Sequence, residues 1–393
     1  MNVLHVVASL GLRRGGVAAS VRSLAQDLAR LGMGVHIMTA DRMREPSVDD
    51  SADAELRTSG VTLQYYPVSS SNWLGQRYAY SPALGKALAR IIPTMDIVHL
   101  HGMWQYPALA AARVCRRAGI PYVLSPCGML DPTGFRRHRV FKHLYGVSVE
   151  RRTLAGAAAI HFTSTFEQRV AHLFGIHRPG MVVPCSIEAG PELLPPLGTF
   201  RRRYPAIGDR PILLFLGRIH AKKRPDLVAE TFVTLANRYP QLWLVMAGPD
   251  DGAEASVRVR LREAGLLSRT IFTGFIAGAE KWAVLADSTI FVLPSKDENF
   301  GVSVVEAVAA GIPVIVSTKV GVAEFIARAG AGLVIDQDPA AWVAGVARLL
   351  DEPETCRAMA EAGRRLVATE FTSERVAASM RELYASAIQS HGA

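Results

Sequence analysis

Two glutamates, Glu298 and Glu306, stand with seven residues between them in the segment SKDENFGVSVVEAVAAGIPVIVS, residues 295–317. The strand-like run TIFVLP precedes them and a second one, GIPVIVS, follows, which predicts a strand, a loop and a helix that begins near Gly301. Carboxylates accept hydrogen bonds from hydroxyl groups, and the first amides of a helix attract an anion. The apolar neighbours of both glutamates disfavour a merely solvated position. The pattern therefore favours a ligand that carries both hydroxyls and phosphate, such as a nucleotide sugar.

Two cations follow another apolar run, in FLGRIHAKKRPDL. Arg218 and Lys223 lie five residues apart beyond the expected strand end. A forked guanidinium and a point-charge ammonium at such a place suit a diphosphate. Lys222 and Arg224 are interpreted as ordinary surface charge.

The first half of the chain offers a glycine pair and a histidine. Gly15 and Gly16, in SLGLRRGGVAAS, are predicted to open a helix after the first strand, where the backbone can approach an anionic ligand. The spacing is not G-x-G-x-x-G, which argues against a nicotinamide site. His101 ends the run DIVHLH and is expected to face a ligand, whereas His99 is interpreted as packed and Cys127 as an inert small side chain.

These residues need parallel sheets to position them. Short apolar runs alternate with helical patterns at 19–32 and 108–119, each closed by glycine, and the alternation restarts after a Pro/Gly/Arg-rich break. We expect an α/β protein with two doubly wound parallel-sheet (Rossmann-like) domains facing across a cleft. The expected divisions are an N-terminal domain at 1–190, a linker at 191–210, a C-terminal domain at 211–370 and a terminal helix at 371–393.

Composition supports a globular protein of two domains. The chain has 393 residues, 49% of them hydrophobic and 20% charged, and no apolar run long enough to cross a membrane. The N-terminus, MNVLHVVASLG, is interpreted as a strand rather than a signal peptide, which predicts a cytoplasmic location. The four cysteines show no metal-site spacing and are expected to be reduced thiols.

The net charge of +9 is unevenly distributed along the chain. Residues 134–152, GFRRHRVFKHLYGVSVERR, hold six Arg or Lys and one Glu, and their apolar residues share one side of a helical wheel. One interpretation is a solvated surface helix with its apolar stripe in the core. The other is a surface that contacts either anionic lipid headgroups, at the inner face of the cytoplasmic membrane, or an acidic acceptor. Nucleic acid is not expected as a partner, because no recognised binding motif accompanies the charge.

At this point the motifs resemble a known family. The E-x7-E block in ENFGVSVVEAVAAGIPVIVS, with GRIHAKKRPDL before it and the glycine pair and VHLHG in the first half, resembles the retaining GT-B glycosyltransferases of the group-one or family-four type. The stretches HGMWQYPALAAARVCRRAGIPYVLSPCGMLDP and LYGVSVERRTLAGAAAIHFTS resemble members that build bacterial surface polysaccharides.

The resemblance implies a hexosyltransferase and a role for each residue. Catalytic roles are implied for His101, Arg218, Lys223 and Glu298. Donor-binding roles are implied for Gly15, Gly16, Asn299, Phe300, Gly301, Val302 and Glu306. The implied donor is a nucleoside-diphosphate sugar. The expected acceptor is a glycan or, as the basic segment at 134–152 suggests, a polyprenyl-diphosphate-linked sugar. The chain departs from many relatives at Cys127, where they have histidine. It also has KKRPD where the lysine is commonly followed by glycine, so the choice of Lys223 over Lys222 as the catalytic lysine is an interpretation.

No cofactor or metal ion is expected, because protein cations can stabilise the leaving diphosphate. The one Asp-x-Asp, Asp336 to Asp338, is interpreted as a turn and helix N-cap. Retention without a visible carboxylate nucleophile in the first half suggests attack on the face from which the diphosphate leaves. Two alternatives stay open: a nucleotide-sugar 2-epimerase, and a catalytically silent sugar-nucleotide-binding scaffold. A periplasmic-type binding protein would need an export signal, and none is visible.

Overall fold

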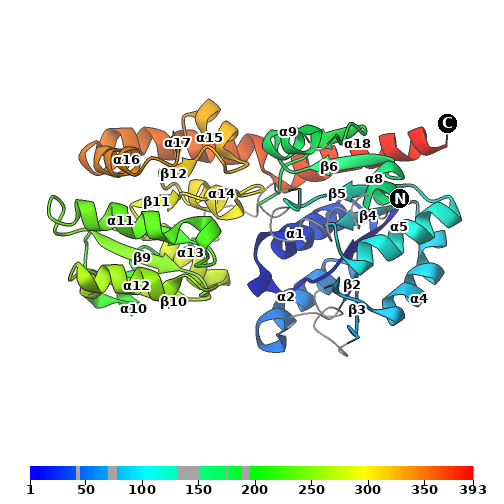
Figure 1. Ribbon diagram of the computed structural model, residues 1–393, viewed down its shortest axis with the longest axis horizontal. Coiled ribbons are helices and arrows are strands. Elements are labelled where there is room, and N and C mark those ends of the chain that lie inside the picture. The colour runs from blue at the N-terminus through cyan, green and yellow to red at the C-terminus, as the bar shows by residue number, and fades with distance from the viewer. Residues whose placement is uncertain (41–44, 70–77, 131–149, 174, 188–193, 393) are drawn as a thin grey trace. The chain divides into compact units, whose positions relative to one another are not determined.

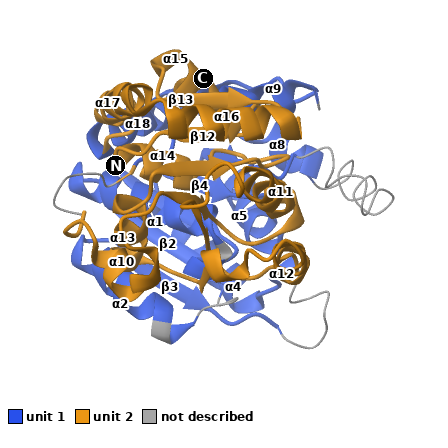
Figure 2. Ribbon diagram, turned by 90° about the vertical axis from the view of Figure 1, so that its left-hand side faces the viewer, with its two compact units in different colours: residues 1–186, 373–393 blue, residues 187–372 orange. Residues whose placement is uncertain are grey.

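The computed structural model describes residues 1–40, 45–69, 78–130, 150–173, 175–187 and 194–392. The chain forms two compact units, coloured separately in Figure 2. Unit 1 is Met1–Ser186 with Ser373–Ala393, and unit 2 is Ile187–Thr372. The terminal segment therefore belongs to the first unit, and the two changes of unit fall at 186/187 and 372/373.

Unit 1 is built on a seven-stranded parallel sheet in the order β3-β2-β1-β4-β5-β6-β7 (Figure 1). Its strands are β1 Asn2–Val7, β2 Gly34–Ala40, β3 Thr62–Tyr66, β4 Ile97–His101, β5 Tyr122–Ser125, β6 Ala159–Phe162 and β7 Gly180–Val182. Most strand residues are buried, as expected for a parallel sheet that is covered on both faces. The strand order reverses between β1 and β4, which makes this the switch point of the sheet.

Helices cover both faces of this sheet. They are α1 Gly16–Arg30, α2 Pro46–Thr58, α4 Pro82–Ile91, α5 Tyr106–Ala118, α8 Arg151–Ala155, α9 Thr165–Leu173 and α18 Ser373–His391. Proline pre-sets the first turn of α2, α4 and α5, and Gly119 ends α5 in the left-handed conformation. One core joins α1 and α18 to the sheet and another joins α4 and α5. Most of the predicted basic helix at 134–152, residues 134–149, lies outside the described residues.

Unit 2 repeats the plan with a six-stranded parallel sheet in the order β10-β9-β8-β11-β12-β13. Its strands are β8 Ile212–Leu216, β9 Trp243–Ala247, β10 Thr270–Gly274, β11 Ile290–Leu293, β12 Val314–Ser317 and β13 Gly332–Ile335. Its helices are α10 Thr199–Arg203, α11 Pro225–Leu235, α12 Glu254–Glu263, α13 Gly278–Ala286, α14 Val302–Ala309, α15 Ala323–Ala329, α16 Pro339–Asp351 and α17 Pro353–Glu370. The switch point of this sheet lies between β8 and β11.

Part of the segment expected to be a linker is ordered structure of unit 2. The carboxylate of Asp287 accepts hydrogen bonds from the backbone N–H groups of Gly198, Phe200 and Arg201 at 2.6, 2.8 and 3.1 Å. This satisfies the first donors of α10, which have no partner within the helix. No periodic pattern marks this helix in the sequence, because it has only five residues.

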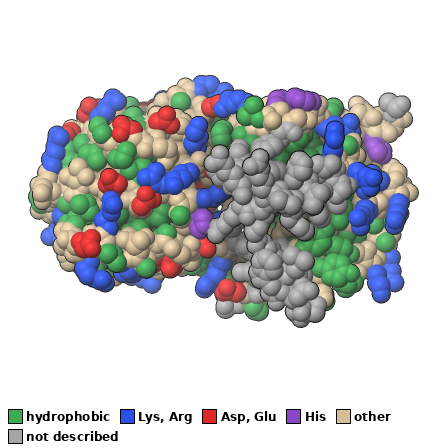
Figure 3. Space-filling model, viewed as in Figure 1, with side chains coloured by type: hydrophobic (Ala, Val, Ile, Leu, Met, Phe, Trp, Pro, Cys, Tyr) green, Lys and Arg blue, Asp and Glu red, His purple; other side chains and the backbone are tan. Residues whose placement is uncertain are grey.

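Over the visible face of unit 2, positive and negative side chains are mixed, with Lys and Arg lying among Asp and Glu (Figure 3).

The interpretation of the Asp-x-Asp is confirmed at its second residue, because Asp338 is the N-cap of α16 and accepts from the Ala340 N–H at 3.2 Å. Within the described part of the chain, no helix is both long enough and apolar enough to cross a bilayer.

Buried histidines make unit 1 sensitive to acid. Burial lowers the pKa of His5 to about 3 and that of His161 to about 4. Above pH 6.5 both the folded and the unfolded histidines are neutral, so the free energy of unfolding is unaffected there. Below pH 6.5 the unfolded chain takes up protons that the folded chain refuses, so stability falls with pH until the folded pKa values are reached.

We therefore predict that the free energy of unfolding falls less steeply between pH 6 and pH 4.5 in the variant His161→Asn than in the unaltered protein. The difference in slope should approach about 1.4 kcal/mol per pH unit, the effect of one proton. Urea unfolding at several pH values measures it. The opposing effect of Glu150, whose pKa burial raises to about 7, is common to both proteins and cancels. Equal slopes would show that His161 is not held neutral by folding.

Candidate functional site

The C-terminal edge of the unit 2 sheet carries most of the predicted site residues. β8 and β11 are neighbours at the switch point, so the chain leaves them in opposite directions and the loops that follow do not cover each other. Residues 217–223 follow β8, and residues 294–301 follow β11. Both loops are described completely.

Two glycines let the loop after β8 lie close to β9. A Cβ atom on Gly248 would come within 2.1 Å of the Gly217 carbonyl oxygen, so no larger residue can stand there without a backbone shift. Arg218 follows directly, and its guanidinium donates to the Asp251 carboxylate at 2.5 Å. Both side chains are more than two-fifths exposed, and an ion pair of this kind contributes little stability. Arg218 can therefore exchange Asp251 for another anion at small cost.

Lys223 is bound to the opposite loop. Its ammonium group forms an ion pair with the Glu298 carboxylate, and the two side chains are 16% and 23% exposed. Beside this pair, the Lys296 N–H donates to the Lys222 carbonyl at 2.8 Å. The Lys222 ammonium pairs with the Asp297 carboxylate at 3.2 Å, and the Lys222 side chain is more exposed than that of Lys223. The geometry agrees with the choice of Lys223 over Lys222 as the cation beside Glu298.

The loop that carries Glu298 is fixed on its other side by backbone hydrogen bonds. The Glu298 N–H donates to the Lys319 carbonyl at 3.0 Å, and its carbonyl accepts from the Gly321 N–H at 2.9 Å. The Phe300 carbonyl accepts from the Val322 N–H at 2.8 Å. Phe300 is buried, and Asn299 between them is half-buried. The loop is thus held by its main chain, which leaves the side chain of Glu298 for Lys223 or a ligand.

Helix α14 begins at this loop with its amides available. Gly301 is the N-cap with a φ of 99°, and a Cβ there would lie 2.8 Å from a methyl group of Val320. Only glycine combines this left-handed conformation with the close approach. Among the described residues, none accepts a hydrogen bond from the backbone N–H of Gly301 or Val302. These donors and the positive end of the helix dipole suit an anion.

Glu306 lies one turn further along α14 and has a partner that the sequence analysis did not identify. Its carboxylate accepts from the Lys281 ammonium at 2.5 Å, and the two side chains are 13% and 25% exposed. Lys281 belongs to α13, so the contact joins residues that are far apart in the chain. The pair holds one Glu306 oxygen, and the carboxylate can still accept further hydrogen bonds through its remaining lone pairs.

The glycine pair lies at the C-terminal edge of the unit 1 sheet. Gly15 is the N-cap of α1 with a φ of 95°, and Gly16 is the first residue of the helix. The turn that precedes them is anchored by side chains: Asp49 accepts from the Leu12 N–H at 2.9 Å, and the Arg22 guanidinium donates to the Leu10 carbonyl at 3.2 Å. The backbone at Gly15 is therefore held in a conformation that few other residues adopt.

His101 ends β4, the strand next to β1 at the switch point, and is opposite Val7 in the register. It is 6% exposed, and its Nε2 lies 2.9 Å from Nδ1 of His5. His5 was not identified from the sequence. A period-two pattern would have placed it on the sheet face of His99 and His101, since His5 pairs with His99 in the register.

Cys127 and Glu150 complete the surroundings of β4 and β5. Burial raises the pKa of the Cys127 thiol to about 12, which keeps it protonated and agrees with its interpretation as inert. Glu150 accepts from the Trp104 N–H at 2.7 Å and so fixes the turn after His101, where Trp104 has a φ of 65°. The sequence analysis missed this role because Glu150 lies within a strongly basic segment.

The structure thus places the predicted residues at the C-terminal edge of each sheet. The two cations, the two glutamates and the first turn of α14 lie at the switch point of unit 2. Gly15, Gly16 and His101 lie at that of unit 1.

Comparison with known proteins identifies the fold and then the family. HepE from Anabaena, solved in complex with UDP and glucose, aligns with a TM-score of 0.77 at 15% identity, covering 98% of this chain and 100% of that one. WaaG, a glycosyltransferase involved in lipopolysaccharide biosynthesis, aligns with a TM-score of 0.70 at 16% identity, covering 96% and 98%. Two parallel-sheet α/β domains of this kind define the GT-B fold of glycosyltransferases.

The family models assign each half of the chain. The model of the group 1 glycosyl transferases matches residues 198–366, and that of the glycosyl transferase 4-like domain matches residues 15–185. The GDP-mannose-dependent alpha-mannosyltransferase of Mycolicibacterium smegmatis is 30% identical over 86% of this chain and 85% of that protein. The 2-deoxystreptamine glucosyltransferase of Streptomyces kanamyceticus is 27% identical over 88% and 93%. The chain belongs to the group 1 glycosyltransferases, which confirms the resemblance seen in its motifs.

Proposed function

We propose that the protein is a retaining glycosyltransferase that moves a hexose or related sugar from a nucleoside-diphosphate sugar to a glycan or lipid-linked acceptor. The observation that carries the proposal is the gathering at one sheet edge of two cations, two carboxylates and an open helix N-terminus. Cations and amides bind phosphate, and carboxylates bind hydroxyls, so the edge has the chemistry of both halves of a nucleotide sugar.

Departure of the nucleoside diphosphate is the step for which unit 2 is equipped. Arg218 and Lys223 would neutralise the charge that develops on the leaving group, with the amides of Gly301 and Val302 as fixed dipoles. Such preorganised electrostatic stabilisation is usually the largest contribution to catalysis. Both cations form ion pairs with carboxylates, so the binding of a diphosphate would exchange one anion for another rather than order mobile side chains.

Recognition of the sugars is assigned to the carboxylates and to unit 1. Glu298 would accept from hydroxyls of the transferred sugar, and Glu306 would bind the vicinal diol of the ribose. Gly15 and Gly16 would lie against the diphosphate and sugar, and His101 near the anomeric carbon. Because the sequence shows no convincing carboxylate nucleophile in the segments of the first half expected to line the cleft, we propose that the acceptor attacks on the face from which the diphosphate leaves.

Relatives support a nucleotide-sugar donor without deciding its base. Those of known name include enzymes dependent on GDP-mannose, and HepE was solved with UDP. We propose that no metal ion or cofactor takes part, because Arg218 and Lys223 supply the positive charge that a metal would bring. A nucleotide-sugar 2-epimerase is the alternative activity on this fold, and it differs in needing no acceptor.

The proposal is tested by incubating radiolabelled UDP-glucose or GDP-mannose with alkyl glycoside acceptors and EDTA. We expect a glycoside product that keeps the anomeric configuration of the donor. Glu298→Ala and Arg218→Ala should each lower the transfer rate by about a hundredfold or more. Arg238→Ala is the matched control, because Arg238 also forms an exposed ion pair with an aspartate in unit 2, away from the site.

Three results would contradict the proposal. They are an inverted product, full activity in the Glu298 or Arg218 variant, and loss of activity in EDTA that added Mg²⁺ restores. Release of nucleoside diphosphate and free sugar from the donor alone, at a rate that an acceptor does not change, would favour the epimerase.

We also propose that residues 134–152 contact the anionic inner face of the cytoplasmic membrane, where a polyprenyl-diphosphate-linked acceptor would lie. The support is the sequence, since six basic residues share this segment with an apolar stripe. The protein should sediment with vesicles rich in anionic lipid at low salt and be released at high salt. Sedimentation that is equal with neutral vesicles, or absent with both kinds, would refute this contact.

A further inference from the structure

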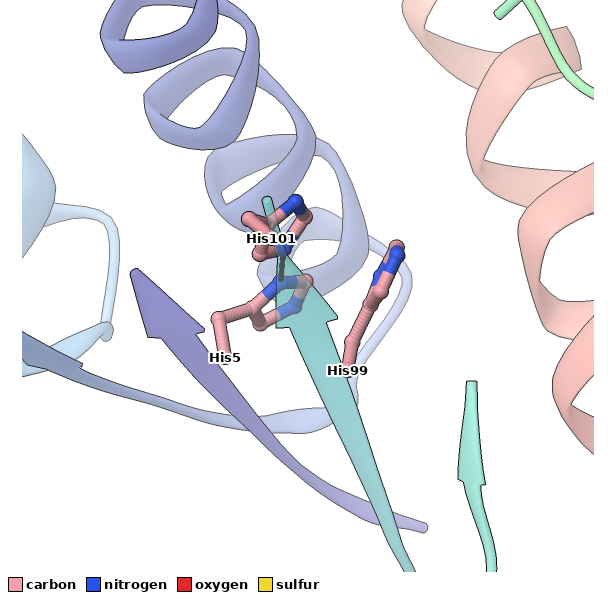
Figure 4. A group of neighbouring side chains, drawn as sticks. All are labelled: His5, His99 and His101. Carbon is pink, nitrogen blue, oxygen red and sulfur yellow. Dashed lines mark hydrogen bonds between the residues drawn. The ribbon is translucent and has the colours of Figure 1, made fainter. Parts of the chain in front are cut away.

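Four neutral histidines lie under the ligand-binding edge of unit 1. They are His5 on β1, His99 and His101 on β4, and His161 on β6, and the first three are drawn in Figure 4. All four are buried, and burial lowers the pKa of each imidazole. A neutral imidazole has one N–H and one bare nitrogen, so each ring must adopt one of two tautomers. The hydrogen bonds of the group decide which.

A backbone carbonyl fixes the tautomer of His161 and, through it, that of His99. The Val183 carbonyl can only accept, so His161 Nε2, at 2.9 Å, carries the proton and Nδ1 is bare. His99 Nε2 lies 3.4 Å from that bare nitrogen and is its donor. His99 Nδ1 is then bare and accepts from the Tyr384 hydroxyl at 2.7 Å. This chain of hydrogen bonds joins α18 to the sheet and is complete without His5 and His101.

The remaining pair, His5 and His101, has two possible arrangements. One of the facing nitrogens must donate across the 2.9 Å between His5 Nδ1 and His101 Nε2 (Figure 4). The other nitrogen of His5, Nε2, is buried and has no hydrogen-bond partner among the described residues. If His101 were the donor, His5 Nε2 would be a buried N–H without an acceptor. If His5 is the donor, Nε2 is a bare acceptor, and buried acceptors without a partner are more common than buried donors without one.

We propose that His5 is a positioning residue that donates from Nδ1 to Nε2 of His101 and so holds His101 as the tautomer that carries its proton on Nδ1. Nδ1 of His101 has no hydrogen bond to a described residue, and it is not one of the buried side-chain atoms that lack a partner. It is therefore the nitrogen left for a ligand. The inference rests on the proposed function in that a donor sugar is the ligand. His101 then serves as a neutral hydrogen-bond donor to a sugar oxygen. Its bare nitrogen, Nε2, accepts from His5 and so does not face the ligand as a general base.

A metal ion at His5, His99 and His101 is the competing interpretation. Their ligand atoms all lie within 4.8 Å of one another. However, both nitrogens of His99 already have partners, and the facing nitrogens of His5 and His101 are 2.9 Å apart. Ligands 2.0–2.1 Å from a tetrahedral zinc ion would lie about 3.3 Å apart. The geometry therefore indicates a shared proton.

Nuclear magnetic resonance of the full-length protein labelled with ¹⁵N-histidine tests the proposal without turnover. Long-range ¹H–¹⁵N spectra distinguish bare from protonated ring nitrogens, and His5→Asn and His101→Asn assign the two rings. We expect His101 with a bare Nε2 and a protonated Nδ1, and a spectrum unchanged by Zn²⁺ or EDTA. The opposite tautomer, or a change in both rings on adding Zn²⁺, would overturn the proposal.

Kinetics separate positioning from mere packing. The amide of His5→Asn can place an N–H near the position of Nδ1, whereas His5→Leu cannot, so kcat should be largely kept in the first and fall by about tenfold in the second. The KM for the donor should change little in either variant. His161→Asn is the control, a buried histidine with no hydrogen bond to His101. Equal losses of kcat in both His5 variants would contradict the proposal.

Failure of the inference and failure of the proposed function give different results. Absence of transfer in the unaltered protein with every donor would refute the function, while the tautomer of His101 would still be decided by the spectrum. Transfer that survives His101→Asn at the full rate would remove the role of His101 and with it the inference. If a His5 variant does not fold, the spectrum of the unaltered protein remains the deciding measurement.

Discussion

The reversal of strand order at one point in each sheet is the constraint on which the site depends. Parallel strands end at a common edge, and only at the reversal do the chains leaving two neighbouring strands diverge and expose the strand ends to a ligand. In unit 2 this point falls between β8 and β11, and in unit 1 between β1 and β4. Every residue assigned to the chemistry lies at the end of one of these strands, in the loop that follows it or on the next helix.

Pairs of opposite charge hold the candidate site residues of unit 2 in place. Lys223 pairs with Glu298, Lys281 with Glu306 and Arg218 with Asp251, and each pair contains at least one group proposed to bind the donor. A nucleotide sugar carries anionic phosphates, which can bind the cation of a pair, and neutral hydroxyls, which can donate to its carboxylate. It can therefore satisfy both members of a pair. Lys281 and Asp251 are therefore the neighbours that determine how freely Glu306 and Arg218 can turn to the ligand.

The sequence predicted the architecture, and the positions of the candidate site residues within it, because both are encoded locally. Apolar runs, helix-closing glycines and the E-x7-E spacing are short-range patterns, and strand ends then place Glu298 and His101 at the C-terminal edges of the two sheets, where the structure has them. What it could not predict depends on contacts across long separations: Lys281 with Glu306, Arg218 with Asp251, and His5 with His101. The helix at Thr199–Arg203 was missed for another reason, since five residues are too few to show periodicity.

The most direct test of the account is a calorimetric comparison of UDP and GDP with their 2′-deoxy counterparts. If Glu306 binds the ribose diol, the full-length protein should bind one ribonucleotide at least about tenfold more tightly than its deoxy form, the effect of a charge-assisted hydrogen bond. Glu306→Ala should abolish that preference while binding of the deoxy form changes little. A preference that survives in the variant would contradict the assignment of Glu306, and no binding of either diphosphate by the folded protein would contradict the nucleotide site itself.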